Sequence, residues 1–240
     1  MYACICAQFT YEKMVSMGRD QDRLIVDAVL AGIADAKHTF AAWTRNVGYF
    51  AWAPEYLITV SVAKAVWEWC APLSVWPEYR LVDAMREAGV ADARLDGNRR
   101  ADLLLYREGA RPHAVVEVKR NVEGWGRIAT DVERLRTMVA GARSSFQLAI
   151  VAFNCTLLGT GSAKGGAVLK DRLSRMAEAA DELSLPGWSC GLTARGVNWD
   201  GHEYWSAAAV VLRRDADASL PSRSTHRPCT RQRAQVLSPT

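Results

Sequence analysis

Paired cysteines, long apolar runs and a charge excess in the body of the chain are all missing from this 240-residue sequence. The six cysteines form no Cys-x-x-Cys pair and no Cys/His cluster, which argues against a structural zinc site and against a disulfide framework. No apolar run approaches the roughly 20 residues needed to cross a bilayer, and the start of the chain lacks the pattern of a secretory signal. We therefore expect a reduced, cytoplasmic protein with no membrane partner.

The basic excess lies at one end of the chain. Residues 213–240 hold six arginines and two aspartates, a difference that equals the net charge of +4 for the whole sequence. The remaining 24 basic and 24 acidic residues balance each other, so a nucleic-acid surface on the body would have to be a local patch. Beyond this body the Ser/Pro/Arg-rich residues 215–240 have little to bury, and we predict a disordered basic tail.

Apolar periodicity predicts an α/β protein in which a helical extension, residues 1–53, packs on a core domain spanning 54–214. Residues 81–88 fit either a helical turn ended by Gly89 or a strand. The other expected helices are 20–37, 54–70, 126–140 and one that ends near Ser184 after the glycine-rich loop 159–166. The expected strands are 74–80, 101–107, 113–119, 146–153, 189–196 and 203–212.

Two of these strands, 101–107 and 113–119, form a hairpin that carries the most informative residues. If residues 108–111 make the loop, Arg107 faces Pro112 and Asp102 faces Glu117, with Cβ atoms roughly 4.5–5.5 Å apart. Alternation then puts Glu117 and Lys119 on one face of the sheet. A slip by one residue would move Asp102 to the other face, so the interpretation depends on this loop length.

An Asp, a Glu and a Lys on one small patch favour metal-assisted phosphodiester chemistry. Hard divalent cations such as Mg²⁺ take carboxylate oxygens together with waters and substrate phosphate oxygens. A lysine beside them can orient a water or offset charge that develops on phosphorus. The competing interpretation is a row of solvated charges, which the strongly apolar remainder of both strands disfavours.

These residues resemble the PD-(D/E)xK nuclease superfamily. Asp102 begins one strand, fourteen residues separate it from Glu117-Val118-Lys119 on the next, and a helix follows. The proline that usually precedes the aspartate is Ala101 here. The resemblance implies a restriction-endonuclease-like αβββαβ core over about residues 54–153, a central mixed sheet flanked by helices, with an N-terminal helix and C-terminal strands as additions.

The resemblance also implies a Mg²⁺-dependent nuclease, with Mn²⁺ as a substitute cation. Asp102 and Glu117 would bind the metal, with the Val118 carbonyl and Glu55 as further ligands, and Lys119 would position the attacking water. The implied partner is DNA, with RNA and a homodimer left open.

Several weaker candidates surround this hairpin. Glu68 and Glu78 are alternative acids, and the glycine-rich loop does not match a phosphate-binding pattern. We expect most of the nine tryptophans to lie in the core, with Trp125 as an exception. The phosphate-binding candidates near the site are Arg99, Arg100, Arg120 and Arg127. The charges expected to pair on an exposed helix face are Asp131, Glu133, Arg134 and Arg136.

Two functions other than a nuclease are also compatible with the sequence. One is a nucleic-acid-binding module of the same fold that has lost catalysis, which would bind DNA in a salt-dependent way without cutting it. The other is a scaffold in which the hairpin is inert and the basic tail recruits a partner.

Overall fold

A computed structural model of the chain describes residues 2–90, 98–107, 111–141, 144–159 and 163–215. Side chains are described within these ranges from residue 20 onward, apart from Ala163. The predicted disordered tail lies, except for Asp215, outside the described residues. In chain order the elements are α1 (Tyr2–Trp43), η1 (Phe50–Trp52), α2 (Glu55–Trp69), β1 (Ser74–Arg80), α3 (Leu81–Glu87), β2 (Arg100–Arg107), β3 (Arg111–Lys119), η2 (Trp125–Arg127), α4 (Ala129–Val139), β4 (Leu148–Leu158), α5 (Ala163–Asp181), β5 (Trp188–Ala194), β6 (Asn198–Trp199) and β7 (Glu203–Arg214).

The strands form one mixed sheet in the order β1-β2-β3-β4-β7-β5, with the short β6 paired to β7. Strands β1, β2 and β3 are antiparallel neighbours, whereas β3 and β4 run parallel. A parallel pair needs a crossover connection, and α4 supplies it. The predicted α/β class with a mixed sheet flanked by helices is therefore confirmed.

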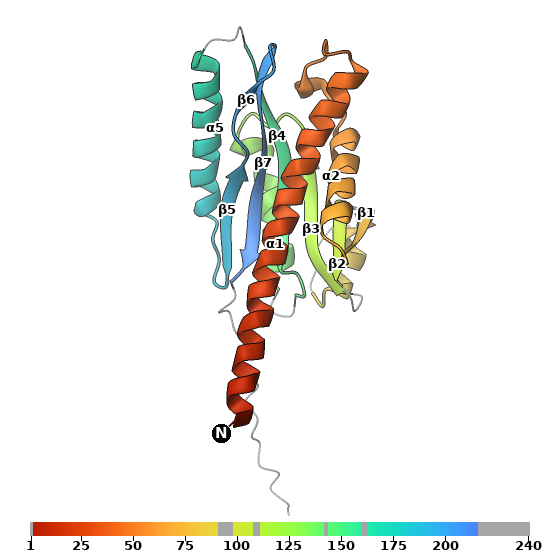
Figure 1. Cartoon of the computed structure of the whole chain (residues 1–240), viewed down its shortest axis with the longest axis vertical. Helices are drawn as coiled ribbons and strands as arrows, with labels where there is room; N and C mark the ends of the chain where they lie inside the picture. Colours follow the sequence, from red (N-terminus) through yellow and green to blue (C-terminus); the bar gives the residue numbers. More distant parts are fainter. Residues whose placement is uncertain (1, 91–97, 108–110, 142–143, 160–162, 216–240) are drawn as a thin grey trace, which may run out of the picture.

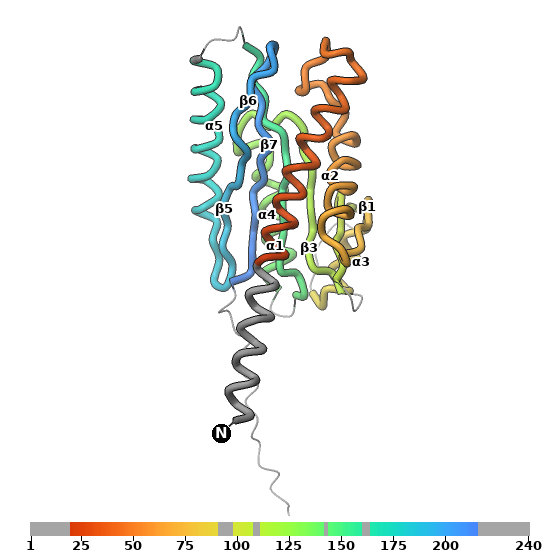
Figure 2. The backbone as a smooth tube through the Cα atoms, in the orientation of Figure 1, coloured from red at the N-terminus to blue at the C-terminus, as the bar shows by residue number. Residues whose placement is uncertain are grey.

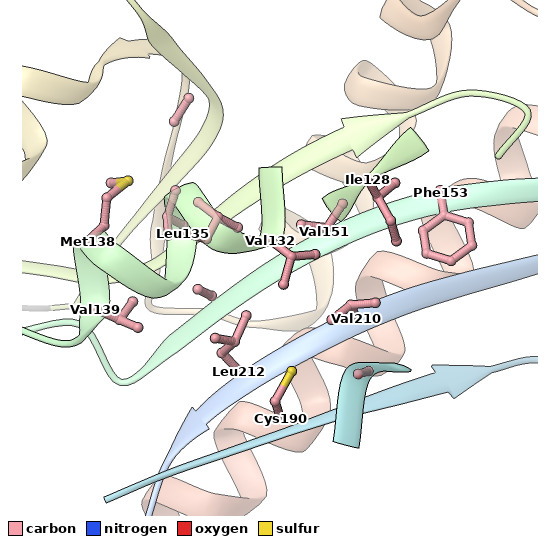
Figure 3. Close-up of a cluster of buried hydrophobic side chains, with 14 of the residues drawn as sticks. Ile128, Val132, Leu135, Met138, Val139, Val151, Phe153, Cys190, Val210 and Leu212 are labelled. Atoms are coloured by element: carbon pink, nitrogen blue, oxygen red, sulfur yellow. The ribbon is translucent and has the colours of Figure 1, made fainter. Parts of the chain in front are cut away.

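Helices cover both faces of this sheet, and each face has its own core (Figure 1). Helices α1 and α2 bury one set of alternate strand residues, including Val116 and Val118 of β3. Helices α3, α4 and α5 bury the other set. Figure 3 shows the second core, where Val132 and Leu135 of α4 lie over Val151 of β4 and neighbouring β7 residues.

Helices α1 and α2 cross at very close range. A Cβ atom at Gly32 would lie 2.5 Å from the Val62 Cα atom, so only glycine fits the crossing without a shift of the backbone. The resulting helix pair packs on β3, β4 and β7. Residues 20–43 of the N-terminal helix thus share one core with the sheet.

Two buried charged contacts hold α1 in place on the sheet. Near the middle of the helix, Asp22 Oδ1 lies 2.9 Å from His113 Nε2 at the start of β3. Towards its end, Lys37 lies in ion-pair contact with Asp200 and, at 3.3 Å, with Glu203 Oε1. Glu203 is completely buried and also accepts a hydrogen bond from the Phe50 N–H of η1. Helix α1, η1 and the β6–β7 hairpin are therefore joined at one end of the molecule.

Most of the predicted elements are present, and the open choice at residues 81–88 resolves as helix α3 followed by Gly89 at φ +80°. The two-residue strand β6 was not predicted. The expectation that most tryptophans lie in the core is wrong, because only Trp188 and Trp205 are buried. Six are exposed: Trp43, Trp52, Trp67, Trp69, Trp76 and Trp199. Trp125, the expected exception, is half-buried against the α4 core.

Within the described part of the chain, none of the helices combines the length and the apolar character that a bilayer crossing requires.

We expect Lys37→Met to lower the free energy of unfolding by about 3 kcal/mol or more, because it leaves the buried Glu203 carboxylate without its cation. Chemical denaturation measures this loss. The matched control is Arg175→Met, which removes an exposed ion pair with Asp171 and should cost less than about 1 kcal/mol. Equal effects in the two variants would contradict the role given to Lys37.

Candidate functional site

The hairpin register at the candidate site is the one predicted. Leu103 lies opposite Val116, so Asp102 and Glu117 occupy the next position along the two strands. The predicted turn is wrong in detail, because Arg107 faces Arg111 and not Pro112. A bulge between Leu105 and Tyr106 absorbs this difference of one residue and restores the register at the site.

Asp102 is bonded to the backbone of the neighbouring strand. Its Oδ2 atom accepts a hydrogen bond from the Val118 N–H at 2.6 Å. On its other side, β1 pairs with β2 in continuous register, so Glu78, at φ +53°, is the β1 residue opposite Asp102. One carboxylate oxygen of Asp102 thus orders the end of β3.

Glu117 is the buried acid of the site, with only 3% of its surface exposed. Its Oε1 atom lies 2.9 Å from Arg134 Nη2 and its Oε2 atom lies 3.8 Å from Lys119 Nζ. Burial raises the pKa of Glu117 to about 7, and the nearby Asp102 charge adds to the rise while Arg134 and Lys119 oppose it. The carboxyl group therefore changes its charge close to neutral pH.

Helix α4 contributes two further charges that were expected on its exposed face. Asp131 lies 2.7 Å from Arg134 Nη2 and 3.7 Å from Lys119 Nζ, so both helix residues point to the end of β3. Asp131 and Arg134 form an i,i+3 pair as predicted, but the expected exposed face is wrong for them, because both side chains are largely buried. The predicted pair is also present at Glu133 and Arg136, whose side chains lie 3.0 Å apart and are more exposed.

A signal for these two residues was present in the sequence. Residues 131, 134 and 138 form one column of a helix, and Met138 in that column is completely buried. A charged pair in line with a buried methionine lies at the border of the buried face. The resulting cluster joins three carboxylates to two cations, so it has a net charge of −1 when Glu117 is ionised.

A cavity of about 440 Å³ opens beside this cluster. Glu55, at the start of α2, is in its wall, and its Oε2 atom accepts a hydrogen bond from the Arg120 N–H at 3.2 Å. Lys119 also borders the cavity and so joins it to the buried cluster. The complete lining is Ala51, Glu55, Lys119, Arg120, Asn121, Val122, Glu123 and Arg127.

The loop that forms the cavity floor is held by β4. Asn121 has φ +43°, and its N–H donates to the Asn154 Oδ1 atom at 2.8 Å. The Thr156 hydroxyl donates to Asn121 Oδ1 at 2.6 Å, and the Val122 N–H donates to the Asn154 carbonyl at 2.9 Å. Because Asn154 is completely buried, these bonds fix the loop to a rigid strand.

Four arginines were predicted to hold phosphates, and the structure divides them. Arg120 and Arg127 line the cavity, and within the described residues neither guanidinium forms an ion pair. Arg99 and Arg100 are exposed near the start of β2 and are not part of the lining. Arg100 Nη1 donates to the Glu78 carbonyl at 2.8 Å.

The acids fit a divalent cation only in part. No group of three or more His, Cys, Asp or Glu side chains suited to a metal occurs in the part of the chain that is described. Glu55 accepts a hydrogen bond from the Arg120 N–H at the cavity wall. Asp102 and Glu117 are then the two carboxylates left to bind a metal ion. One feature fits a cation, the net negative charge of the cluster when Glu117 is ionised, whereas Glu117 Oε1 already lies 2.9 Å from the Arg134 guanidinium.

The chain was compared with family models, curated proteins and solved structures. None of them matches it.

The raised pKa of Glu117 predicts how stability depends on pH in a chelating buffer. The folded state holds the Glu117 proton up to about pH 7, whereas the unfolded chain releases it near its ordinary value of 4.5. This contribution to stability is complete below that ordinary value and is lost as pH rises through about 7. The loss amounts to about 3 kcal/mol.

Denaturant titrations over this pH range test the expectation. Glu117→Gln should remove that part of the pH dependence, whereas Glu133→Gln, on the exposed face of the same region, should keep it. Stability curves of the wild type and Glu117→Gln that stay parallel would contradict the assignment.

Proposed function

We propose that this protein is a metal-dependent nuclease of the PD-(D/E)xK type. The observation that carries the proposal is the meeting of Asp102, Glu117 and Lys119 at the carboxyl end of β3, beside a cavity lined by two arginines that form no ion pair with any described residue. Carboxylates and a lysine next to a cationic cavity suit hydrolysis of a phosphodiester. DNA as the substrate comes from the resemblance, and RNA stays open.

The order of elements supports a restriction-endonuclease-like core. Helix α2 is followed by the antiparallel strands β1, β2 and β3, then by the crossover helix α4 and the parallel strand β4. This agrees with the αβββαβ order that the resemblance implies, with α3 as an insertion. Helix α1 and the strands after α5 would then be additions to that core.

In this proposal Asp102 and Glu117 would hold the Mg²⁺ or Mn²⁺ ion, with the Val118 carbonyl beside them. The ion would supply charge stabilisation at the phosphate and a more acidic water. Lys119, which lies between the Glu117 and Asp131 carboxylates, would hold the attacking water and offset charge on the phosphate. Arg134 would keep Glu117 oriented, and Arg120 and Arg127 would hold neighbouring phosphates.

One observation favours the alternative of a binding module without catalysis. Arg134 and Lys119 already neutralise much of the charge on Glu117 and Asp131, so the cluster is stable without an added cation. That alternative predicts salt-dependent DNA binding and no cleavage with either Mg²⁺ or Mn²⁺.

We expect the purified protein to cut DNA in Mg²⁺, and EDTA to abolish the cutting. Asp102→Asn and Lys119→Met should each lower the cleavage rate at least about 100-fold, because they remove a metal ligand and the residue that positions the water. Gel assays on plasmid, linear and single-stranded DNA, repeated on RNA, measure these rates.

The matched control is Arg136→Gln, which removes a charge from the outer pair of α4 and should leave cleavage unchanged. Cleavage that persists at full rate in both site variants would reject the proposed site. Binding without any cleavage in the wild type would favour the inactive module.

A further inference from the structure

Two exposed aromatic residues are sequence neighbours of the cavity lining. Trp52 has 61% and Tyr56 has 72% of its surface exposed. Each directly follows a residue of the cavity wall, Ala51 in one case and Glu55 in the other. Covering a large exposed ring stabilises a complex, so two such residues next to the lining of a polar cavity are able to contribute to the binding of a ligand that has a flat apolar face.

The backbone segment that carries Trp52 is held by buried contacts. Phe50, two residues earlier, is completely buried, and its N–H donates to the buried Glu203 carboxylate. The Tyr49 ring packs edge-on against Trp52 with centroids 4.8 Å apart, and it also meets His202 at 6.4 Å. Figure 2 follows this segment, between α1 and α2, at the same end of the molecule as the loop after β3. A ring held in this way loses little freedom when it binds a flat partner.

The lining of the cavity carries the three cations Lys119, Arg120 and Arg127 against the two carboxylates Glu55 and Glu123, and this net charge of +1 suits an anionic ligand. Arg120 and Arg127 in the lining form no ion pair among the described residues, and Lys119 borders the same space. A volume of about 440 Å³ is of the size that encloses one small ligand, so it admits a single nucleotide unit but not a stretch of double helix.

We propose that the cavity receives an unpaired nucleic-acid strand, with Trp52 and Tyr56 as stacking platforms for the bases next to the enclosed nucleotide. Stacking needs the open face of a base, which a paired duplex covers. The arginines would bind the phosphates that follow. This inference rests on the proposed function, because it names the substrate of the proposed nuclease as single-stranded or frayed nucleic acid.

Equilibrium binding in EDTA tests the inference separately from cleavage. The probe is a short fluorescein-labelled DNA strand, alone or annealed to its complement, and anisotropy gives the Kd. We expect the single strand to bind at least about ten-fold more tightly than the duplex. Trp52→Ala and Tyr56→Ala should each weaken single-strand binding by about ten-fold, and Trp52→Phe should restore most of it.

Trp67→Ala is the matched control. Trp67 is 65% exposed on the same helix as Tyr56, and the two residues lie about 16 Å apart along the helix axis. It should leave single-strand binding unchanged. A duplex bound as tightly as the single strand, or equal losses for Trp52→Ala and Trp67→Ala, would overturn the inference.

A lipid surface is the other ligand that exposed tryptophans attract. Co-sedimentation with phosphatidylcholine–phosphatidylserine vesicles that is lost in Trp52→Ala, together with no preference for single strands, would overturn the inference in favour of a membrane. Strand-selective binding without cleavage in Mg²⁺ would support the inference and reject the nuclease proposal. Cleavage in Mg²⁺ by a protein that binds single strand and duplex equally tightly would support the nuclease proposal and overturn the inference.

Discussion

The burial of one carboxyl group at the end of a fully covered strand organises this molecule. From residue 112 to residue 118, β3 has no exposed residue, because helices lie on both of its faces. Glu117 is the next-to-last residue of that run and needs cations within reach to carry a charge. Lys119 supplies one from the same strand and Arg134 supplies another from α4. The position of α4 is thereby linked to the state of the acid, and the crossover helix becomes part of the site.

A second buried charge has a comparable effect at the cavity rim. Glu203 forms an ion pair with Lys37 of α1 and accepts a hydrogen bond from the Phe50 N–H of η1. The segment before α2 is therefore bound to the β6–β7 hairpin. Ala51, in this segment, and Glu55, at the start of α2, are both part of the cavity lining. The N-terminal helix therefore does more than cover the sheet: its ion pair with Glu203 determines where one side of the cavity stands.

The sequence predicted the elements whose patterns are local. Alternation along 101–107 and 113–119 indicated the hairpin, and its register at Leu103 and Val116 came out as expected. The inward turn of Asp131 and Arg134 was not predicted, because the i,i+3 spacing of the two charges alone fits an exposed face, and the apolar Met138 in the same helix column was not weighed with it. Burial of the tryptophans was wrongly expected because hydrophobic character alone does not say which rings a compact body can enclose. The cavity depends on contacts between α2, β3 and β4 that no local pattern encodes.

The bulge between Leu105 and Tyr106 has a consequence for how this hairpin tolerates change. It separates the turn from the strand ends, because the extra residue is accommodated before the pairs at Leu104 and Leu103 begin. Lengthening or shortening the connection by a residue can then be absorbed by moving or removing the bulge. Related chains would be free to vary the turn while the acids at the far end keep their partners across the strands.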